Sequence, residues 1–275
     1  MIPVHAKKRL GQHFLNDENI ALKITESIQV PCENLLEVGP GTGVLTKYLL
    51  KKLSAVSYQL SANNPESGIQ NPEFSHFLAL DVDHESIAYL KQMYPDHANV
   101  FLEADFLKFD PEKYFNGCFT VIGNFPYNIS SQIFFKVLDH VDLIPEVVCM
   151  LQKEVAERIA SPPGNKAYGI LSVLLQAWYR IDYLFTVSEH VFIPPPKVKS
   201  AVIRLTRNET TDLGCNPAVF KQIIKTAFNQ RRKTLRNALK SISFIHSPEL
   251  EELKTKRAEQ LGVKEFVFLA NAAKM

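Results

Sequence analysis

The stretch that decides the fold is residues 34–52, NLLEVGPGTGVLTKYLLKK. The apolar run at 34–38 predicts a buried strand, and the glycines at positions 39, 41 and 43 predict a tight turn. Residues 44–52 then show a helical pattern of apolar positions. A strand, a glycine turn and a helix in this order are the opening unit of a doubly wound α/β domain.

The same alternation continues on both sides of this stretch. A helix is predicted at 16–29, where apolar side chains follow an Asn16-Asp17 cap. Apolar runs predict further strands at 77–82, 100–102, 118–122, 146–151 and 200–205, with helices at 85–93, 130–139 and 155–159. We therefore expect a mainly parallel sheet with helices on both of its faces.

Residues 53–76 interrupt this alternation and are rich in Ser, Asn, Pro and Gly. We interpret them as an insertion. Residues 55–60 offer an alternative second strand, but that run ends without a carboxylate, whereas the run 77–83 ends in Asp81 and Asp83. The second strand is therefore predicted at 77–82, and the insertion either restricts entry to a nearby site or is a surface addition without a role.

Charge is distributed unevenly along the 275 residues, of which 46% are hydrophobic and 22% charged. This length and composition suit one large core with a smaller second domain and exclude a disordered or collagen-like chain. The net charge is only +2, yet the chain holds 15 basic and 22 acidic residues up to His190, and 16 and 7 after it. The basic last part is either a polyanion-binding surface or a solvated helical face.

The four cysteines, Cys32, Cys118, Cys149 and Cys215, form no CxxC pair and no cysteine–histidine cluster at zinc spacing. We expect reduced thiols and no metal site. The first residues lack an apolar signal region, and no stretch approaches the ~18 apolar residues of a membrane span. We therefore expect a cytoplasmic protein without a membrane partner.

The glycine turn is a candidate cofactor site, because it lets the backbone approach a ligand while the next helix points free N–H groups at it. Gly39, Gly41 and Gly43 depart from the dinucleotide pattern GxGxxG in the spacing of the third glycine, and Glu37 stands before the first of them. An acidic residue before the first glycine is typical of S-adenosylmethionine sites, where an ammonium group needs a partner. Asp81 is placed to accept from ribose hydroxyls. A purely structural turn with a surface Asp is the alternative.

Asn124-Phe125-Pro126-Tyr127 is the most specific motif, and it follows an apolar strand. The exocyclic amine of adenine is a poor nucleophile because its lone pair is delocalised. The Asn124 amide oxygen and the Phe125 carbonyl would both accept from this amine and favour a tetrahedral nitrogen. Pro126 stiffens the turn, and Tyr127 offers a face on which a base stacks. A turn with a buried Tyr is the alternative.

Residues 218–240 predict a basic amphipathic helix without acidic residues. Its cations would bind phosphates while a pocket elsewhere reads the extruded base. The basic residues are Lys221, Lys225, Arg231, Arg232, Lys233, Arg236 and Lys240. Lys7, Lys8 and Arg9 lie in an N-terminal arm that either closes over the same substrate or is a disordered tail.

Seven segments resemble the bacterial small-subunit (16S) ribosomal RNA adenine N6-dimethyltransferases, in the family's order and over nearly the whole chain. They are residues 8–15 (KRLGQHFL), 37–46, 104–107 (ADFL), 124–130, 151–155 (LQKEV), 192–200 (FIPPPKVKS) and 227–236 (AFNQRRKTLR). The resemblance implies a Rossmann-like class I methyltransferase fold with a mainly parallel seven-stranded sheet, followed by a small all-α C-terminal domain.

The resemblance also implies an activity, the dimethylation of two adjacent adenines in the 3′-terminal hairpin of small-subunit rRNA during ribosome assembly. S-adenosylmethionine would be the methyl donor, and a monomer would act on the assembling small subunit. By matching motifs, the cofactor would be bordered by His13, Leu15, Gly39, Asp81, Asp105 and Asn124. Phe192 would stack on the flipped base opposite Tyr127. His13 stands where the family often has Asn, and Asp81 where Glu is common.

The resulting plan has an arm at 1–15, a methyltransferase domain at 16–207 that includes the insertion, a linker at 208–216 and a helical RNA-binding domain at 217–275. Three other interpretations stay open. The first is a methyltransferase acting on DNA or on a single RNA adenine, and the second is a nucleic-acid-binding assembly factor without activity. The third, a dehydrogenase, is disfavoured by the glycine spacing and the lack of a clear hydride-transfer acid or base.

Overall fold

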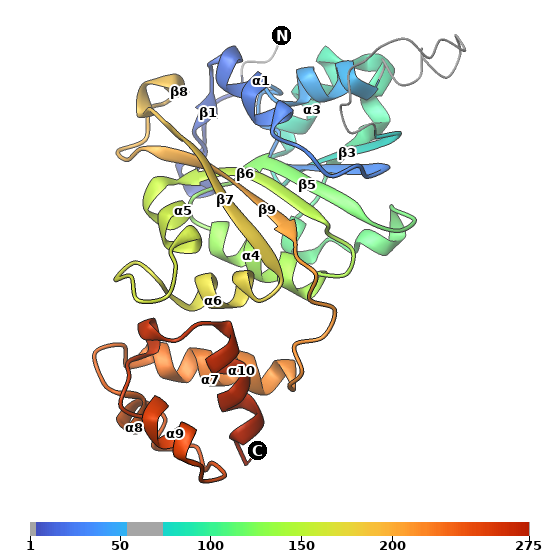
Figure 1. Cartoon of the computed structure of the whole chain (residues 1–275). Coiled ribbons are helices and arrows are strands. Elements are labelled where there is room, and N and C mark those ends of the chain that lie inside the picture. Colours follow the sequence, from blue (N-terminus) through green and yellow to red (C-terminus); the bar gives the residue numbers. More distant parts are fainter. Residues whose placement is uncertain (1–3, 54–73, 275) are drawn as a thin grey trace. The chain divides into compact units, whose positions relative to one another are not determined.

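The computed structural model describes residues 4–53 and 74–274. Within these residues, seven strands form a sheet in the order β4-β3-β2-β5-β6-β9-β7 (Figure 1). The strands are β2 (Asn34–Val38), β3 (His76–Asp81), β4 (Phe101–Glu103), β5 (Phe119–Asn124), β6 (Glu146–Gln152), β7 (Tyr179–Val187) and β9 (Ser200–Arg207). Strands from β4 to β6 pair in parallel, and β9 pairs antiparallel with β6. The mainly parallel sheet and the Rossmann-like class I fold are confirmed.

The strand order reverses beside β2, and this places the site. From β2 the chain continues outward to β3 and β4 on one side and returns to β5 and β6 on the other. In such sheets, ligands bind outside the carboxyl ends of the strands at the point of reversal. The ends of β2 and β5 are therefore where a ligand is expected. The pairing of β2 with His76–Asp81 also confirms the second strand, while the alternative at 55–60 lies outside the described residues.

Helices cover both faces of this sheet. In Figure 1, α1 and α3 lie on one side of the strands and α4 lies on the other. Asp17 begins α1 because its carboxylate accepts from the backbone N–H groups of Asn19 and Ile20. Residues 46–53 are also helical. The other helices of the first two thirds are α1 (Glu18–Glu26), α3 (His84–Met93), α4 (Ser130–Asp139), α5 (Lys153–Ala160) and α6 (Ile170–Gln176).

Short elements complete the chain. The pair β1 (Phe14–Leu15) and β8 (Phe192–Ile193) forms a separate two-stranded antiparallel sheet. The short 3₁₀ helices are η1 (Lys8–Leu10), η2 (Pro95–Val100), η3 (Phe106–Lys108), η4 (Pro111–Lys113), η5 (Glu189–Val191) and η6 (Ala258–Gln260). The β1–β8 pair joins the N-terminal arm to a segment almost 180 residues further on, so the arm belongs to the folded structure.

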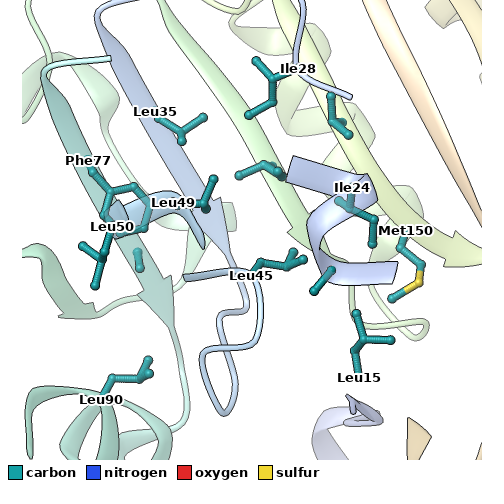
Figure 2. Close-up of a cluster of buried hydrophobic side chains, with 14 of the residues drawn as sticks. Leu15, Ile24, Ile28, Leu35, Leu45, Leu49, Leu50, Phe77, Leu90 and Met150 are labelled. Carbon is teal, nitrogen blue, oxygen red and sulfur yellow. The ribbon is translucent and has the colours of Figure 1, made fainter. Parts of the chain in front are cut away.

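A hydrophobic cluster fills the space between the sheet and the helices on one face (Figure 2). Three completely buried side chains belong to helices: Ile24 of α1, Leu49 of the helical residues 46–53, and Leu90 of α3. They pack with strand residues such as Leu35 and Met150. Each buried aliphatic side chain contributes ~1.5–3 kcal/mol relative to its exposed state. This packing holds the carboxyl ends of the strands in a fixed arrangement.

The chain divides into two compact units. The first holds Met1–Ala156 and Asp182–Thr206, and the second holds Glu157–Ile181 and Arg207–Met275. The second unit thus takes α6 from the middle of the chain, whereas the sequence placed a linker at 208–216. Neither α6 nor β7 was predicted, although residues 179–187 (YRIDYLFTV) alternate apolar and polar side chains over most of their length, as a half-buried strand does.

The C-terminal part is helical, with α7 (Pro217–Asn229), α8 (Leu235–Ala238), α9 (Pro248–Leu253) and α10 (Val263–Ala272). The expectation of one helix over 218–240 is wrong. Gln230 has φ −119° and ψ 46°, so α7 ends there and a turn precedes α8. The predicted apolar face is real, since Phe220, Ile224 and Phe228 are buried.

The remaining sequence expectations concern membrane spans, metal sites, the cysteines and the insertion. Among the described residues, no helix is long and apolar enough to cross a membrane, and no group of three or more His, Cys, Asp or Glu could hold a metal ion. Cys32 and Cys118, 86 positions apart in sequence, lie with their sulfur atoms 3.2 Å apart. Residues 54–73 of the predicted insertion lie outside the described part of the chain.

Candidate active site

A cavity lies at the carboxyl ends of β2, β3 and β5, where the topology predicts a ligand. Many of its lining residues are those chosen from the sequence: His13, Gly39, Gly41, Asp81, Asp105, Asn124, Phe125, Pro126 and Tyr127. Gly11, Gln12, Val82, Leu107, Asn128 and Ile129 also line it. Residues from the N-terminal arm, the glycine turn and the ends of three strands therefore meet in one place, which we call the cofactor cavity.

The glycine turn passes close to the end of β5. Gly39 has φ +72°, and a Cβ at this position would lie 3.5 Å from the carbonyl oxygen of Asn124. A positive φ strains any residue other than glycine. Gly123, in β5, is tighter still, because a Cβ there would lie 2.2 Å from the carbonyl oxygen of Val38. These glycines allow β2 and β5 to approach closely enough to share one cavity.

Asp81 ends β3 at the cavity wall, where only 9% of the residue is exposed. Its carboxylate accepts from the backbone N–H of Asp83 at 2.9 Å and from that of Gly41 at 3.4 Å. Burial nevertheless raises the pKa of Asp81 to about 6. A buried carboxylate with spare acceptor positions suits a ligand that offers hydroxyl groups.

Asp105 follows β4 on the same wall and is half-buried. Its Oδ1 accepts from the backbone N–H of Leu107 at 3.0 Å, which fixes the side chain at the start of η3. Leu107 itself lines the cofactor cavity with Val82 and Ile129. An acceptor beside apolar side chains is the environment that an adenine ring with its exocyclic amine requires.

Glu37 is buried beneath the glycine turn, with 1% of the residue exposed. Thr46 Oγ1 donates to Glu37 Oε2 at 2.7 Å, yet burial raises the pKa of Glu37 to about 8. It lines a smaller adjoining cavity together with Leu15 and Gly39, and Asn124 lines both cavities. The carboxyl group therefore lies one layer behind the cofactor cavity and is kept protonated at neutral pH unless a cation approaches it.

The amide of Asn124 has a fixed orientation. Its Nδ2 donates to the backbone carbonyl of His13 at 3.0 Å, so its Oδ1, the acceptor, faces away from the arm. The Phe125 backbone N–H donates to the carbonyl of Met150 at 2.9 Å, and the Phe125 ring is buried edge-on against Phe134. Phe125 thus contributes its backbone to the site, while its side chain anchors the turn in the core.

Tyr127 joins the cofactor cavity to a second cavity, which we call the target cavity. This cavity is lined by Ala6, Lys8, Gly11, Gln12, His13, Tyr127, Gln152, Pro194, Pro195, Pro196, Lys197 and Val198. The Tyr127 hydroxyl is 2.5 Å from Ser200 Oγ. The imidazole of His13 stacks on the tyrosine ring with the centroids 5.4 Å apart, and its Nδ1 lies 2.8 Å from the Pro194 carbonyl. One face of Tyr127 is therefore covered by His13.

The structure does not place Phe192 where the resemblance puts it. Phe192 is 2% exposed, pairs with Leu15 between β8 and β1, and belongs to the hydrophobic core cluster. Its ring lines neither the cofactor cavity nor the target cavity. In this structure His13, and not Phe192, lies against the tyrosine ring, and stacking of Phe192 on an extruded base opposite Tyr127 stays a prediction.

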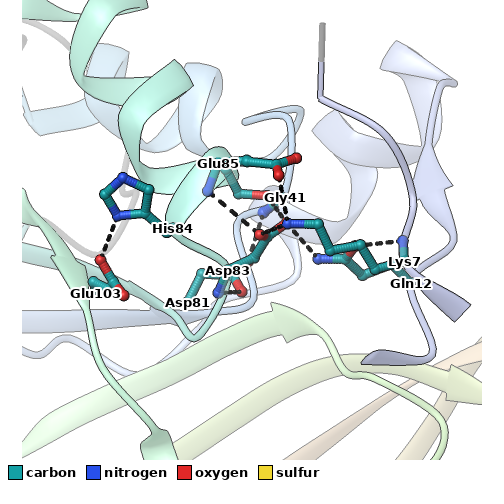
Figure 3. Close-up of polar contacts among 9 residues, drawn as sticks. Lys7, Gln12, Gly41, Asp81, Asp83, His84, Glu85 and Glu103 are labelled. Atoms are coloured by element: carbon teal, nitrogen blue, oxygen red, sulfur yellow. Dashed lines mark hydrogen bonds and ion pairs between the residues drawn. The ribbon is translucent and has the colours of Figure 1, made fainter. Parts of the chain in front are cut away.

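Lys7, which the sequence assigns to RNA binding, is held by two carboxylates. Its ammonium group lies 2.5 Å from Asp83 Oδ1 and 3.1 Å from Glu85 Oε1 (Figure 3). Both carboxylates would compete with an RNA phosphate for this ammonium group, and RNA binding by Lys7 stays a prediction. Lys8 and Arg9, on η1, are exposed.

The predicted RNA-binding cations of the second unit stand on α7, in the turn after it and around α8. Lys225, Arg232, Lys233 and Arg236 are exposed, while Lys221 and Arg231 are partly buried. Arg231 donates to the backbone carbonyl of Lys166, and Arg236 lies 3.2 Å from Glu251. The basic character of the segment is retained although the single helix is not.

Sequence reasoning missed Gln12 and Asp83. No role is predicted for Gln12, which lies in the segment 8–15, or for Asp83, which follows Asp81 at the end of a predicted strand. The structure brings them together, since Gln12 Nε2 donates to Asp83 Oδ2 at 3.1 Å (Figure 3). The available signal was the pair Asp81 and Asp83, which one residue separates. This spacing lets Asp81 face the cavity while Asp83 caps α3.

Comparisons with known proteins agree with this geometry. The family model "Ribosomal RNA adenine dimethylase" matches residues 4–59 and 73–266. The chain is 54% identical over 271 residues to "Ribosomal RNA small subunit methyltransferase A" of Bacteroides fragilis, covering 98% of this chain and 92% of that protein. It is 52% identical to the protein of the same name from Cytophaga hutchinsonii, covering 98% of each chain.

Solved structures show the same fold. A dimethyladenosine transferase from Plasmodium falciparum superposes with a TM-score of 0.73 at 25% identity, covering 94% of this chain and 96% of that chain. The 23S rRNA methyltransferase ErmE gives a TM-score of 0.66 at 21% identity, covering 94% and 99%. With the family model matched over most of its length, and with relatives above 50% identity, the chain belongs to the ribosomal RNA adenine dimethylase family.

Proposed function

We propose that the chain transfers methyl groups from S-adenosylmethionine to N6 of two adjacent adenines in the 3′-terminal hairpin of small-subunit rRNA, during assembly of the subunit. As a family member, the chain is an S-adenosylmethionine-dependent rRNA adenine dimethyltransferase. The choice of the small subunit is supported by the names of the relatives above 50% identity. The observation that carries the proposal is the position of the Asn124–Tyr127 turn between the cofactor cavity and the target cavity.

The cofactor cavity suits S-adenosylmethionine in its chemistry. Asp81 offers a buried acceptor for ribose hydroxyls, and Asp105 offers an acceptor beside Leu107 for the adenine amine. We assign Gly39 and Gly41 to the methionine end, where the backbone can approach closely. Glu37 lies behind them, and a cationic ammonium nearby would favour its ionised form. Leu15 contributes from the adjoining cavity.

The cofactor supplies an electrophilic methyl group, and the chain supplies the orientation of the nucleophile. Asn124 Oδ1 and the Phe125 carbonyl accept from the two amine hydrogens of adenine, which favours a tetrahedral nitrogen with an available lone pair. Pro126 limits the freedom of the turn, and the Tyr127 ring supports the extruded base. His13 must leave the tyrosine face, or slide along it, when the base enters.

The RNA is held by charge. We assign this role to Lys8 and Arg9 of the arm and to the cations around α7 and α8: Lys221, Lys225, Arg231, Arg232, Lys233 and Arg236. Phosphate contacts position a nucleic acid without reading its sequence, so selection of the target falls to the target cavity and to the shape of the subunit. We further propose a cytoplasmic monomer with the domain plan 1–15, 16–207, 208–216 and 217–275.

Methylation of defined substrates tests the proposal. The purified protein and its Asn124→Ala variant are incubated with S-adenosylmethionine and small subunits that lack the modification, and the digested rRNA is analysed by mass spectrometry. Two N6,N6-dimethyladenosines per rRNA are expected, in one 3′-terminal fragment, with none from the variant. Monomethyladenine alone, or methylation of DNA in preference to the subunit, would support a different methyltransferase. Absence of cofactor binding would support an assembly factor without activity.

A further inference from the structure

The N-terminal arm is tied to the first unit by one buried carboxylate. Asp83 has 1% of its side chain exposed. Its Oδ1 lies 2.5 Å from Lys7 Nζ, and its Oδ2 accepts from Gln12 Nε2 at 3.1 Å (Figure 3). Gln12 Oε1 in turn accepts from the backbone N–H of Lys7 at 2.8 Å. Both arm residues are therefore fixed to Asp83 and to each other.

The burial of Asp83 explains why these contacts are strong. Burial on its own would raise the pKa of Asp83, but bonds from Lys7, Gln12 and Ser86 bring the pKa below its ordinary value. The carboxylate is therefore ionised at neutral pH and depends on its donors, because a buried charge without partners is costly. Lys7 has a second carboxylate, Glu85, at 3.1 Å, which adds to its attachment.

Asp83 is also in contact with the residue assigned to the cofactor ribose. Its backbone N–H donates to Asp81 Oδ1 at 2.9 Å. The same residue thus holds the arm through its side chain and orients Asp81 through its backbone. Since α3 begins immediately after Asp83, this arrangement is anchored to the sheet and to a buried helix.

The part of the arm that is held this way forms walls of both cavities. Gly11, Gln12 and His13 line the cofactor cavity and the target cavity. The His13 carbonyl accepts from Asn124 Nδ2, so the position of the arm decides which way the Asn124 acceptor faces. An arm detached from Asp83 would leave the cofactor cavity open on one side and the Asn124 amide free to rotate.

We propose that Lys7, Gln12 and Asp83 form a latch that holds the arm against the cofactor and orients Asn124, so that Lys7 acts in cofactor binding and not in RNA binding. The three are positioning residues, since they act through Asp81, His13 and Asn124. This inference rests on the proposed function for the identity of the cofactor. It predicts which substrate each lysine of the arm serves, because Lys7 is latched and its neighbour Lys8 is exposed.

The test compares Lys7→Met with Lys8→Met in the full chain. Affinity for S-adenosylmethionine is measured by calorimetry without RNA, and affinity for small-subunit rRNA is measured separately at several salt concentrations. Lys7→Met should weaken cofactor binding about 10-fold to 100-fold, as expected for loss of a charge-assisted contact to a buried group. Its RNA affinity and salt dependence should not change. Lys8→Met should show the reverse, with unchanged cofactor affinity and a shallower salt dependence.

Further variants keep the test decisive. Asp83→Asn, which retains the size of the side chain, should match Lys7→Met in cofactor affinity, and the double variant should be no weaker than either single variant because one contact is being removed. Lys7→Arg should restore binding. Thermal unfolding shows whether each variant folds. If Asp83→Asn fails to fold, Lys7→Met and Gln12→Ala, which leave Asp83 in place, decide the question.

Two outcomes would overturn the latch: an unchanged cofactor affinity in Lys7→Met, or a loss of RNA affinity in that variant with a shallower salt dependence. Failure of the proposed function would look different. Cofactor binding would then respond to Lys7 as described, while no small-subunit rRNA was methylated by the unaltered protein.

Discussion

The carboxyl edge of the sheet and the basic segment from α7 to α8 hold their functional groups in opposite ways. At the sheet edge, Asp81, Glu37 and Asn124 are each fixed by a hydrogen bond to a neighbouring element, and the first two are almost fully buried. In the basic segment, Arg232 and Lys233 are exposed side chains in a turn. Binding at the first region depends on shape, and binding at the second depends on charge.

This difference determines how each region responds to substitution. A fixed group in a cavity loses its function when it moves by a fraction of an ångström, and the loss is independent of salt. A group of exposed cations tolerates displacement, but its contribution falls as salt rises, because binding releases counterions. Each prediction below tests whether one of the two regions behaves as its geometry requires.

The largest effect is expected for Asn124→Ala. Removing the acceptor that orients the target amine should lower kcat on the order of 10³-fold, as when one polar group of a catalytic cradle is lost. The affinity for S-adenosylmethionine should stay measurable, since the other walls of the cavity are retained. Single-turnover methylation and calorimetry on the same preparation separate the two. A variant that methylates at the normal rate would remove Asn124 from the mechanism.

Glu37→Gln should change how stability depends on pH. Burial raises the pKa of Glu37 from its ordinary value of 4.5 to about 8, so the native state holds this proton across a range where the unfolded chain releases it. The stability of the cofactor-free protein should therefore fall as pH rises from about 5 to 8, by on the order of 3 kcal/mol, since the loss is at most ~1.4 kcal/mol per pH unit in this range. The variant should lack this loss. Denaturant unfolding at pH 5, 7 and 9 measures the difference, and parallel curves would contradict it.

Loss of exposed positive charge in the basic segment should weaken RNA binding by a smaller factor than Asn124→Ala lowers kcat, and the effect should depend on salt. The combined substitution Lys225→Gln, Arg232→Gln and Lys233→Gln should lower the affinity for small-subunit rRNA about 10-fold to 100-fold near physiological salt. The slope of log affinity against log salt should fall by ~0.7–0.9 for each phosphate contact removed. Filter binding across a salt series supplies both values. An unchanged slope would show that the segment is a solvated face without an RNA partner.

The smallest effect is expected from the titration of Asp81. Its pKa is raised to about 6 in the cofactor-free protein, and only the ionised carboxylate accepts from two ribose hydroxyls. The contribution of Asp81 to the affinity for S-adenosylmethionine should therefore fall about 10-fold for each pH unit below 6. Calorimetry between pH 5 and 8 tests this, with Asp81→Asn as the control that should bind weakly but without this pH dependence.

Sequence patterns predicted the parts of the molecule that depend on neighbouring residues. The strand at Asn34–Val38, the glycine turn and the Asn124–Tyr127 turn are local features, and each lies where its pattern placed it. The cofactor-cavity residues followed because the ends of parallel strands converge at one edge of the sheet.

The features that sequence patterns did not indicate depend mostly on contacts between distant segments. Whether Phe192 faces a cavity or the core is decided by its pairing with Leu15. Whether Lys7 is available to RNA is decided by Asp83. The break between α7 and α8 occurs at Gln230, which is neither Gly nor Pro and so carries no signal in the sequence.

The close approach of the parallel neighbours β2 and β5 at Gly123 has a consequence for how this protein tolerates mutation. A Cβ at Gly123 would lie 2.2 Å from the Val38 carbonyl, so even alanine would force the two strands apart. Gly39 and Asn124, the residues that follow Val38 and Gly123, would then separate as well. Gly123 lines neither cavity, yet in a saturation mutagenesis screen it should rank among the least substitutable positions. The residues essential for activity should therefore include some that support the cavities from below without lining them.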